Sequence, residues 1–452
     1  MLRLYDTATR QVRELALREP GKVGIYVCGP TVDGPPHLGH GRFAIVYDVL
    51  RRYLEWSGLE VRFVTNITDI DDKIIARAQR ESRPWDEIAR RCENVWFRAM
   101  DGINVKAPTD TPHATDYVDE MVAMIAELVE RGSAYVTDDG VYLSVQSVPD
   151  YGLLAHQSLD DLLAGGGDRT VFGADTKRHP ADFALWKLAK PDEPAWPSPW
   201  GDGRPGWHSE CVVMSLQLLG EGFDLHGGGQ DLRFPHHENE RAQAVALGKR
   251  FCNHWIHNGF VVDADGEKMS KSIGNVDNLL DLIEQYDPRT YRMLLLQSHY
   301  RSPLRVGQVN LAAAEKSLSG LDALMARGGA VDGQVPDAEV LDRFGAAMDD
   351  DLDTPKAMAL MFDTVRRANT VLDAADDGAA APLVAAVREI AGAVGLRLGD
   401  TTAVPDEVLA RAAAIDEARA GKDYATADEV RAALVADGWI VETTADGTVV
   451  RR

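Results

Sequence analysis

The sequence predicts an α/β fold built on a parallel sheet, followed by an α-helical bundle and a small mixed α+β domain. Strand-like apolar runs at 23–28 and 60–67 flank a helical pattern at 42–57. Strand, helix and strand in succession are typical of parallel sheets. Beyond residue 310, Ala-rich amphipathic helices replace the strands. Because ligands of parallel sheets bind at the carboxyl ends of the strands, we expect the functional residues there.

The sheet pattern is interrupted and then resumes. Residues 105–200 have a different sequence pattern, with a helix expected at 115–131 and a Gly-rich loop. We interpret them as an insertion. Strand-like runs return at 223–226 and 255–262. Helices are expected at 311–327, 337–348, 355–374, 381–395 and 424–436, before a final strand, Asp-Gly turn and strand. The predicted divisions are 1–110 with 200–262 (sheet domain), 111–199 (insertion), 263–312 (connecting region), 313–400 (helical bundle) and 401–452 (C-terminal domain).

Length and composition indicate a globular protein of several domains. The chain has 452 residues, of which 45% are hydrophobic and 26% charged, and these values exclude a disordered or fibrous protein. With 48 Lys and Arg against 71 Asp and Glu, the formal charge of −23 argues against a nonspecific basic nucleic-acid coat but not against a local basic face. The four cysteines are far apart, so we expect reduced thiols or separate metal ligands instead of disulfides.

No targeting or membrane segment is expected. The first twenty residues interleave charged and apolar residues, unlike a signal peptide. No stretch approaches the roughly 18 consecutive apolar residues of a membrane-spanning helix. We therefore predict a cytoplasmic protein with no membrane partner.

A histidine motif follows the first predicted strand. His37, Gly39 and His40 stand at the entrance to a helix, where free backbone N–H groups and the helix dipole favour phosphate. Gly39 would let a base or a phosphate approach the backbone, and the two imidazoles can donate hydrogen bonds to phosphate oxygens. Taken alone, the motif fits a His-containing tight turn equally well.

A lysine-rich loop follows the last predicted strand of the sheet. Lys268 and Lys271 belong to the sequence KMSKS, which also supplies two serine hydroxyls. Such a loop can close over a triphosphate and stabilise nucleotidyl transfer by positioned charge. A solvated basic turn is the simpler interpretation of these five residues alone. Together and in this order, the two motifs resemble the signatures of the class I aminoacyl-tRNA synthetases.

Four residues form a candidate zinc site. Cys28 ends the first predicted strand, Cys211 lies in the segment GWHSEC, and His236 and Glu240 share one helix face at a spacing of four. Two thiolates, an imidazole and a carboxylate suit Zn²⁺ better than Mg²⁺ or Ca²⁺. The alternatives are small buried cysteines and a surface pair on a helix. Beside an ATP site, zinc would bind a substrate thiolate in preference to a serine hydroxyl, which indicates cysteine as the substrate.

The chain resembles the cysteinyl-tRNA synthetase family of class I enzymes from its first strand to its last fifty residues. The stretches that carry the resemblance are YVCGPTV, HLGHGR, FVTNITDIDDKIIARA, FALWK, GRPGWHSEC, HGGGQDLRFPHHENE, HNGF and GEKMSKSIGNV. They follow one order over more than two hundred residues. The resemblance implies a Rossmann-like catalytic domain with a connective insertion, a stem-contact region with the lysine loop at 263–312, and an anticodon-binding domain at 401–452.

The resemblance also implies a role for each candidate residue. One zinc ion per chain would be held by Cys28, Cys211, His236 and Glu240. ATP binding and catalysis would involve His37, Gly39, His40, Lys268 and Lys271. Thr68, Trp207 and Asp231 match positions near the cysteine and its adenylate, and their simpler interpretations are an N-cap, a core indole and a turn Asp.

The implied activity has two steps, carried out by a monomer. L-cysteine would be activated with Mg²⁺-ATP to cysteinyl-adenylate and then transferred to the 3′ end of tRNA-Cys. The closest rival on the same scaffold is the cysteine ligase of mycothiol biosynthesis, against which stand TNITDIDDKIIARA, Glu240 and the long C-terminal region. A second rival is a non-catalytic tRNA-binding paralogue, against which the intact HLGH, KMSKS and zinc ligands argue.

Two departures from the family pattern concern the edges of the predicted sites. Residues 31–36 read TVDGPP where the family commonly has a Tyr-Asp pair. Val450 stands where many relatives place a tryptophan, so no aromatic anticodon contact is carried over to it. Basic side chains that would either track tRNA phosphates or solvate helix faces are Arg366, Arg367, Arg419, Lys422 and Arg431.

Overall fold

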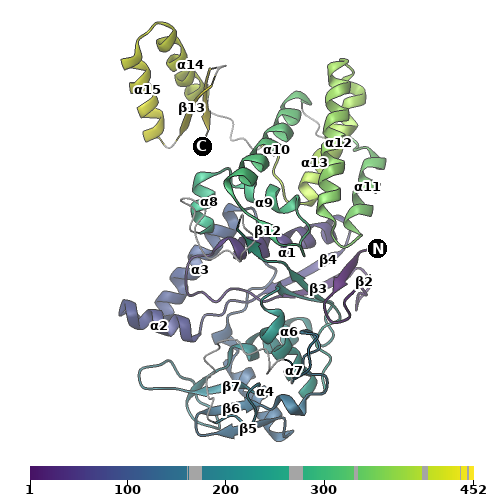
Figure 1. Ribbon diagram of the computed structural model, residues 1–452, viewed down its shortest axis with the longest axis vertical. Coiled ribbons are helices and arrows are strands. Elements are labelled where there is room, and N and C mark those ends of the chain that lie inside the picture. Colours follow the sequence, from purple (N-terminus) through teal and green to yellow (C-terminus); the bar gives the residue numbers. More distant parts are fainter. Residues whose placement is uncertain are drawn as a thin grey trace.

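A parallel four-stranded sheet in the order β10-β9-β3-β4 forms the centre of the molecule. Its strands are β3 (Lys22–Val27), β4 (Glu60–Thr65), β9 (Leu225–Gly229) and β10 (Trp255–Asn258). The computed structural model describes residues 1–159, 161, 176–263, 278–329, 334–399, 406–437, 439–444 and 447–451. Figure 1 shows this sheet between the inserted segment below and the helical bundle above. The predicted α/β class with a parallel sheet is confirmed.

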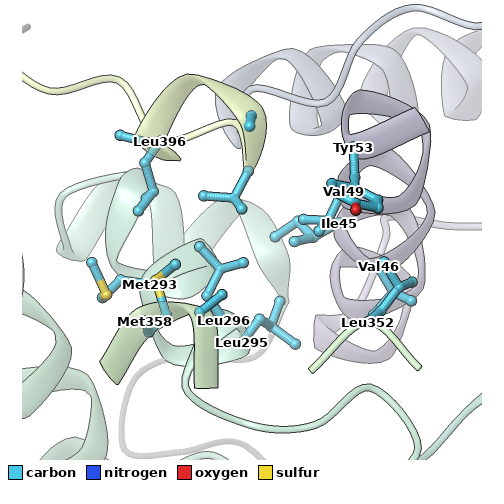
Figure 2. Close-up of a cluster of buried hydrophobic side chains, with 14 of the residues drawn as sticks. Ile45, Val46, Val49, Tyr53, Met293, Leu295, Leu296, Leu352, Met358 and Leu396 are labelled. Atoms are coloured by element: carbon cyan, nitrogen blue, oxygen red, sulfur yellow. The ribbon is translucent and has the colours of Figure 1, made fainter. Parts of the chain in front are cut away.

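Helix α1 (Leu38–Trp56) joins β3 to β4 and carries the histidine motif at its N-terminus. It begins earlier than predicted because the His37 side chain caps its first turn. The apolar side chains of α1 pack between the sheet and helix α9 (Arg289–Leu296). Figure 2 shows Ile45 of α1 pointing toward Leu295 of α9. This core fixes the position of the histidine motif relative to the sheet.

The chain between β4 and β9 forms an insertion with its own sheet. Helices α2 (Asp72–Glu81) and α3 (Trp85–Gly102) lead into the turn η1 (Ala114–Tyr117) and helix α4 (Val118–Glu130). An antiparallel sheet then pairs β5 (Ala134–Thr137), β6 (Gly140–Leu143), β7 (Phe183–Leu188) and β8 (Gly203–Pro205) in sequence order. Helix α6 (Trp207–Leu219) starts just after β8 and packs against α7 (Glu238–Ala246), which returns the chain to the central sheet.

Helices dominate the second half of the chain, as predicted. They are α8 (Leu279–Gln285), α9, α10 (Gln308–Arg327), α11 (Ala338–Met348), α12 (Thr354–Asp373) and α13 (Asp377–Ala393). Helix α13 begins before the predicted 381 because the Asp376 side chain accepts a hydrogen bond from the Ala379 N–H and caps it. The apolar faces of α9 to α13 are continuous with the core around α1.

The C-terminal segment has a separate core. It contains α14 (Asp406–Ala420), α15 (Tyr424–Ala436) and the antiparallel strands β13 (Ile440–Thr444) and β14 (Gly447–Arg451). Its buried side chains include Trp439 and Val450, and they form a cluster distinct from the main core. Figure 1 shows this unit set apart from the bundle. The predicted final helix and strand pair are therefore present, and α14 is an addition to the prediction.

Short or charged segments account for the elements that the prediction missed. The N-terminal hairpin pairs β1 (Arg3–Asp6) with β2 (Gln11–Glu14), two strands of four residues that each contain two charged side chains. The single strand predicted at 255–262 is two strands in the structure. The first ends before Gly259, and the second, β11 (Val261–Val262), pairs with β12 (Leu304–Arg305) outside the central sheet. The domain limits given above stay predictions. No helix in the described part of the chain has the length and apolarity required to span a membrane.

A buried arginine and a buried aspartate tie the sheet domain to the bundle. Arg42 of α1 donates hydrogen bonds to the carbonyls of Phe260, Tyr300 and Ser302. Asp351, between α11 and α12, accepts hydrogen bonds from the Tyr300 hydroxyl and from the Tyr5 N–H, each at 2.8 Å. The helix with the histidine motif, the chain after β10 and the bundle thus share one polar junction.

We predict that Arg42→Leu destabilises the protein by about 2–3 kcal/mol, because it leaves buried carbonyls without their donor. Arg80→Leu, on the exposed face of α2, is the matched control and should change stability by less than about 0.5 kcal/mol. Differential scanning calorimetry of both variants measures the difference. Equal melting temperatures for the two variants would contradict the role given to Arg42.

Candidate active site and metal centre

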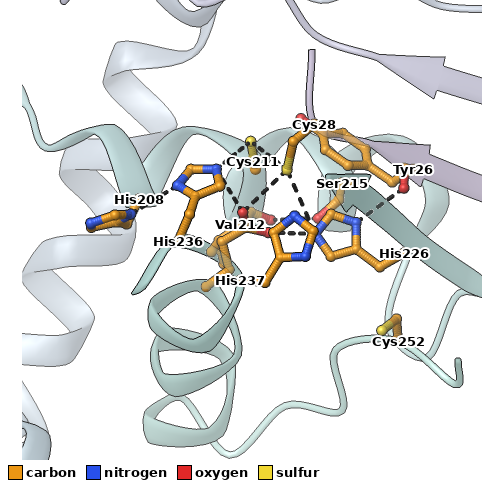
Figure 3. Close-up of polar contacts among 12 residues, drawn as sticks. Tyr26, Cys28, His208, Cys211, Val212, Ser215, His226, His236, His237 and Cys252 are labelled. Carbon is orange, nitrogen blue, oxygen red and sulfur yellow. Dashed lines mark hydrogen bonds and ion pairs between the residues drawn. The ribbon is translucent and has the colours of Figure 1, made fainter. Parts of the chain in front are cut away.

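Four side chains from distant parts of the sequence meet below the carboxyl end of β3. Cys28 follows β3, Cys211 lies on α6, His236 lies in the turn η3 (Arg233–His237), and Glu240 lies on α7. Cys28 Sγ is 3.5 Å from Cys211 Sγ and 3.3 Å from Glu240 Oε1. His236 Nε2 is 2.8 Å from Glu240 Oε1 and 3.7 Å from Cys211 Sγ. Figure 3 shows the side chains of Cys28, Cys211 and His236 pointing toward one another.

The cluster has the composition and size of a metal site. One ligand atom from each of the four residues lies within 4.8 Å of all the others, and each residue is at most 4% exposed. Burying two thiols, an imidazole and a carboxylate together destabilises the folded state through desolvation unless a cation compensates the charge. The donor set is the one expected for zinc or a similar soft cation. The structure therefore brings together all four predicted ligands.

The two thiols differ in acidity even without a cation. Burial raises the pKa of the Cys28 thiol well above its usual value. Burial acts in the same direction on Cys211, but hydrogen bonds from Cys28 and His236 outweigh it and lower the Cys211 pKa to about 6. One thiol of the pair is thus a ready thiolate ligand near neutral pH, which favours uptake of a cation.

Two aromatic neighbours hold the imidazole of His236. His208 Nδ1 lies 2.8 Å from His236 Nδ1, so that His236 Nε2 turns toward the thiols. The Trp207 indole stacks on the His236 ring, with ring centroids 3.9 Å apart and planes at 20°. A hydrogen bond to the distal nitrogen is the common way to orient a metal-binding histidine. Trp207 was expected near the substrate, whereas His208 was not singled out in the sequence, although it stands three residues before Cys211 on the same helix.

The other two predicted substrate residues differ in their distance from the cluster. Thr68 is buried, donates a hydrogen bond to Glu210 Oε2 at 2.6 Å and accepts one from Asn66 Nδ2 at 3.2 Å. The side-chain amide oxygen Oδ1 of Asn66 in turn lies 3.7 Å from Cys211 Sγ, which links Thr68 to the cluster. Asp231 is exposed just beyond the end of β9, and among the described contacts no hydrogen bond or ion pair joins it to the four ligands.

The histidine motif forms an interlocked pair of rings. His37 Nδ1 accepts a hydrogen bond from the His40 N–H at 3.3 Å, and His40 Nδ1 accepts one from the His37 N–H at 3.2 Å. The rings stack with centroids 3.7 Å apart. A side chain on Gly39 would place its Cβ 2.9 Å from His37 Cε1, so glycine is needed for this contact. Since burial lowers the pKa of His40 to about 3 and its Nδ1 accepts, the neutral His40 ring carries its proton on Nε2.

The lysine loop lies outside the described residues, but the chain that follows it contacts the segment next to the histidine motif. Lys268 and Lys271 fall in the segment 264–277, of which nothing is described. Before it, β11 ends at Val262 and pairs with β12. After it, the Leu279 N–H donates a hydrogen bond to the Pro36 carbonyl at 2.9 Å, next to His37.

Comparison with known proteins identifies the family. A family model described as the catalytic domain of class I (C) tRNA synthetases matches residues 14–316, and a DALR domain model matches residues 343–399. The chain belongs to the class I cysteinyl-tRNA synthetases. Similar curated proteins named cysteine–tRNA ligase come from Streptomyces avermitilis (43% identical, 99% of this chain and 98% of the relative covered) and Alkalilimnicola ehrlichii (44% identical, both chains covered fully at 100%).

Solved structures of other synthetases share the fold of this cysteinyl-tRNA synthetase family member. Methionyl-tRNA synthetase of Mycobacterium tuberculosis bound by methionyl-adenylate is 16% identical, with a TM-score of 0.61 over 82% of this chain and 90% of that one. A putative arginyl-tRNA synthetase from Campylobacter jejuni is 13% identical, with a TM-score of 0.55 over 84% of this chain and 94% of that one. At these identities the likeness concerns the fold alone.

Three further histidines around the cluster escaped prediction. His226 Nε2 lies 2.6 Å from Glu240 Oε2. His237 Nδ1 lies 2.9 Å from His257 Nε2, and His257 Nδ1 lies 2.7 Å from the Thr7 hydroxyl. These residues come from β9, η3 and β10, and only the sheet order brings them together. No spacing in the sequence points to them.

We predict that His40 remains neutral in the folded protein from about pH 8 to pH 5, because burial and the neighbouring His37 lower its pKa to about 3. The unfolded chain binds a proton at this residue below about pH 6.5, so this term stabilises the unfolded state as the pH falls from 6.5 toward 3. NMR of histidine-labelled protein, with the signal assigned by its loss in His40→Asn, measures the titration. A midpoint near 6.5 in the folded protein would contradict the prediction.

Proposed function

We propose that this chain is a cysteine–tRNA ligase in which zinc, bound by Cys28, Cys211, His236 and Glu240, selects the thiolate of the substrate. The observation that carries the proposal is the convergence of those four donor atoms within 4.8 Å, in a chain of the class I cysteinyl family. The relatives named cysteine–tRNA ligase match the chain over its full length, including the C-terminal region that an amino-sugar ligase would not need. Nothing in the intact motifs favours a silent paralogue.

Zinc supplies a strong bond to a thiolate and a weak one to a neutral hydroxyl. Packing alone distinguishes near-isosteric side chains by only about 1–3 kcal/mol, whereas cysteine must be separated from serine by far more. The chain's own residues make the site dry and ordered. Trp207 covers one face of His236, and Thr68 with Asn66 supports Cys211 from the other side. These positions suit contact with the substrate side chain.

The first chemical step is attack of the cysteine carboxylate oxygen on the α-phosphorus of ATP. A new O–P bond forms as the bond to the β-phosphate bridging oxygen breaks, and pyrophosphate leaves with Mg²⁺. His40 offers an uncharged Nε2–H donor at the first turn of α1, whose N-terminus favours the negative charge of phosphate, and we propose that His37 contacts the same phosphates. Lys268 and Lys271 are proposed to neutralise the charge on the leaving group. No protein nucleophile is required, since positioning and electrostatics suffice.

In the second step the terminal ribose hydroxyl of tRNA-Cys takes the cysteinyl group and AMP departs. The bundle and the C-terminal unit are proposed to hold the tRNA, and we propose a monomer that works in the cytoplasm. Of the candidate basic residues, Arg366 pairs with Asp363 at 3.0 Å and Arg431 donates a hydrogen bond to the Val441 carbonyl at 3.2 Å. Val450 is buried in the C-terminal core, as its apolar side chain requires.

We predict that Cys211→Ala removes bound zinc and lowers cysteine-dependent ATP–pyrophosphate exchange by more than about 100-fold, because the site loses a thiolate ligand. Cys252→Ala is the matched control, since Cys252 lies outside the cluster and should keep both properties. Metal analysis and exchange assays on both variants, followed by charging of tRNA-Cys, measure the effect. A Cys211→Ala variant that activates cysteine normally would exclude the proposed zinc site.

We predict that His40→Asn lowers kcat for ATP–pyrophosphate exchange by about 100-fold while zinc content stays unchanged. Asparagine keeps an acceptor at the place of Nδ1, so the helix cap survives, but it lacks the Nε2–H donor. Measuring the zinc content of the same preparation separates a loss of catalysis from a loss of the metal. An unchanged kcat would show that the donor does not serve the reacting phosphates.

A further inference from the structure

The two oxygens of Glu240 face different partners. Oε1 faces the other three predicted metal ligands, at 2.8 Å from His236 Nε2 and 3.3 Å from Cys28 Sγ. Oε2 lies 2.6 Å from His226 Nε2. The carboxylate is fully buried, so water does not compete for either oxygen. One oxygen is therefore available to a cation, while the other is occupied by an imidazole.

His226 is held by the sheet itself. In the parallel pairing of β3 with β9, Tyr26 stands opposite His226, and His226 Nδ1 lies 3.0 Å from the Tyr26 carbonyl oxygen. Figure 3 shows this bond on the side of the ring away from the cluster. The ring stacks on His237, with centroids 4.5 Å apart, and meets the edge of Trp255. Since His226 is fully buried, these contacts leave it one orientation.

The hydrogen-bond pattern makes His226 a partner of Glu240 and not a metal ligand. The Tyr26 carbonyl can only accept, so Nδ1 carries a proton. A contact of 2.6 Å between Nε2 and Oε2 also holds a proton between its two atoms. Nε2 lies farther from Cys28 Sγ, at 3.8 Å. Both ring nitrogens of His226 are thus engaged by protein partners, Nδ1 by the Tyr26 carbonyl and Nε2 by Glu240.

We propose that His226 is a positioning residue that retains Glu240 Oε2, so that Glu240 offers zinc a single oxygen and a coordination position stays open for the cysteine thiolate. The inference rests on the proposed function, because it concerns the same zinc. Carboxylates bind cations through one oxygen or through both. A zinc site that must accept a substrate needs an unfilled position, and hydrogen bonds to the ligands commonly set their geometry. Release of Oε2 would let Glu240 fill that position.

Two substitutions separate the two bonds of His226. In His226→Asn, the amide nitrogen stands at the place of Nδ1 and keeps the bond to the Tyr26 carbonyl, but nothing reaches Glu240. In His226→Gln, the amide nitrogen stands at the place of Nε2 and can donate to Glu240 Oε2. The glutamine variant is therefore the conservative replacement for the proposed role, and the asparagine variant is its matched opposite.

The experiment compares both variants with the wild-type holoenzyme in metal content, in ATP–pyrophosphate exchange and in the visible spectrum of the Co²⁺-substituted protein. We expect His226→Asn to retain one metal per chain and to raise KM for cysteine by about 10- to 100-fold, with a smaller change in kcat. Its Co²⁺ bands should differ from those of the wild type and should not shift when cysteine is added. His226→Gln should have a KM within about threefold of the wild type and the wild-type spectral shift.

Each other outcome overturns the inference. Asparagine and glutamine variants with equal KM values would show that the bond to Glu240 does not matter, and loss of metal from His226→Asn alone would make His226 a residue for metal retention. If His226→Asn does not fold, the inference is rejected when the KM for cysteine of His226→Gln is more than about tenfold above that of the wild type. Failure of the proposed function is distinguishable, because the wild-type protein itself would then hold no metal or show no cysteine-dependent exchange.

Discussion

The parallel pairing of β3 with β9 is the constraint on which the site depends. It joins strands almost two hundred residues apart and sets Tyr26 opposite His226 and Val27 opposite Gly227. Cys28 follows directly, and its backbone N–H donates a hydrogen bond to the Gly227 carbonyl of β9 at 3.2 Å. The glycines of β9 let neighbours lie against the strand, since a Cβ on Gly228 would stand 2.7 Å from His237 Cε1. Any shift of this register would separate Cys28 from the residues that follow β9.

The insertion serves the site through its final helix. Its antiparallel sheet ends at β8, and α6 starts at Trp207 with the ring stacked on His236. Cys211 and His208 lie on neighbouring turns of α6 and meet the turn η3 and α7, which carry His236 and Glu240. One helix thus delivers both a thiol and the partner that orients the imidazole. The predicted zinc ligands and the two histidines that contact them, His208 and His226, come from the end of β3 and from α6, η3, α7 and β9.

Helix α1 connects the histidine motif predicted to bind ATP with the chain that precedes the lysine loop and with the helical bundle. Its first turn presents the His37 and His40 rings, and Arg42 in the next turn holds the carbonyls of Phe260 and Tyr300. Phe260 precedes the lysine loop, and Tyr300 binds Asp351 at the bundle. This arrangement places the ATP motif, the start of the loop and the first contact with the bundle on one polar junction.

The sequence alone determined the fold class, the order of the segments and the four predicted metal ligands, because hydrophobic period and ligand chemistry are local properties of the chain. The family resemblance placed Trp207 and Thr68 near the substrate cysteine and its adenylate, and the structure adds that Trp207 stacks on His236 and that Asn66 links Thr68 to Cys211. Only the tertiary structure revealed His208, His226, His237 and His257, since their partners lie on other strands and helices and no spacing in the chain reports the sheet order. The same holds for the two faces of the Glu240 carboxylate, because the direction of a buried oxygen is decided by packing.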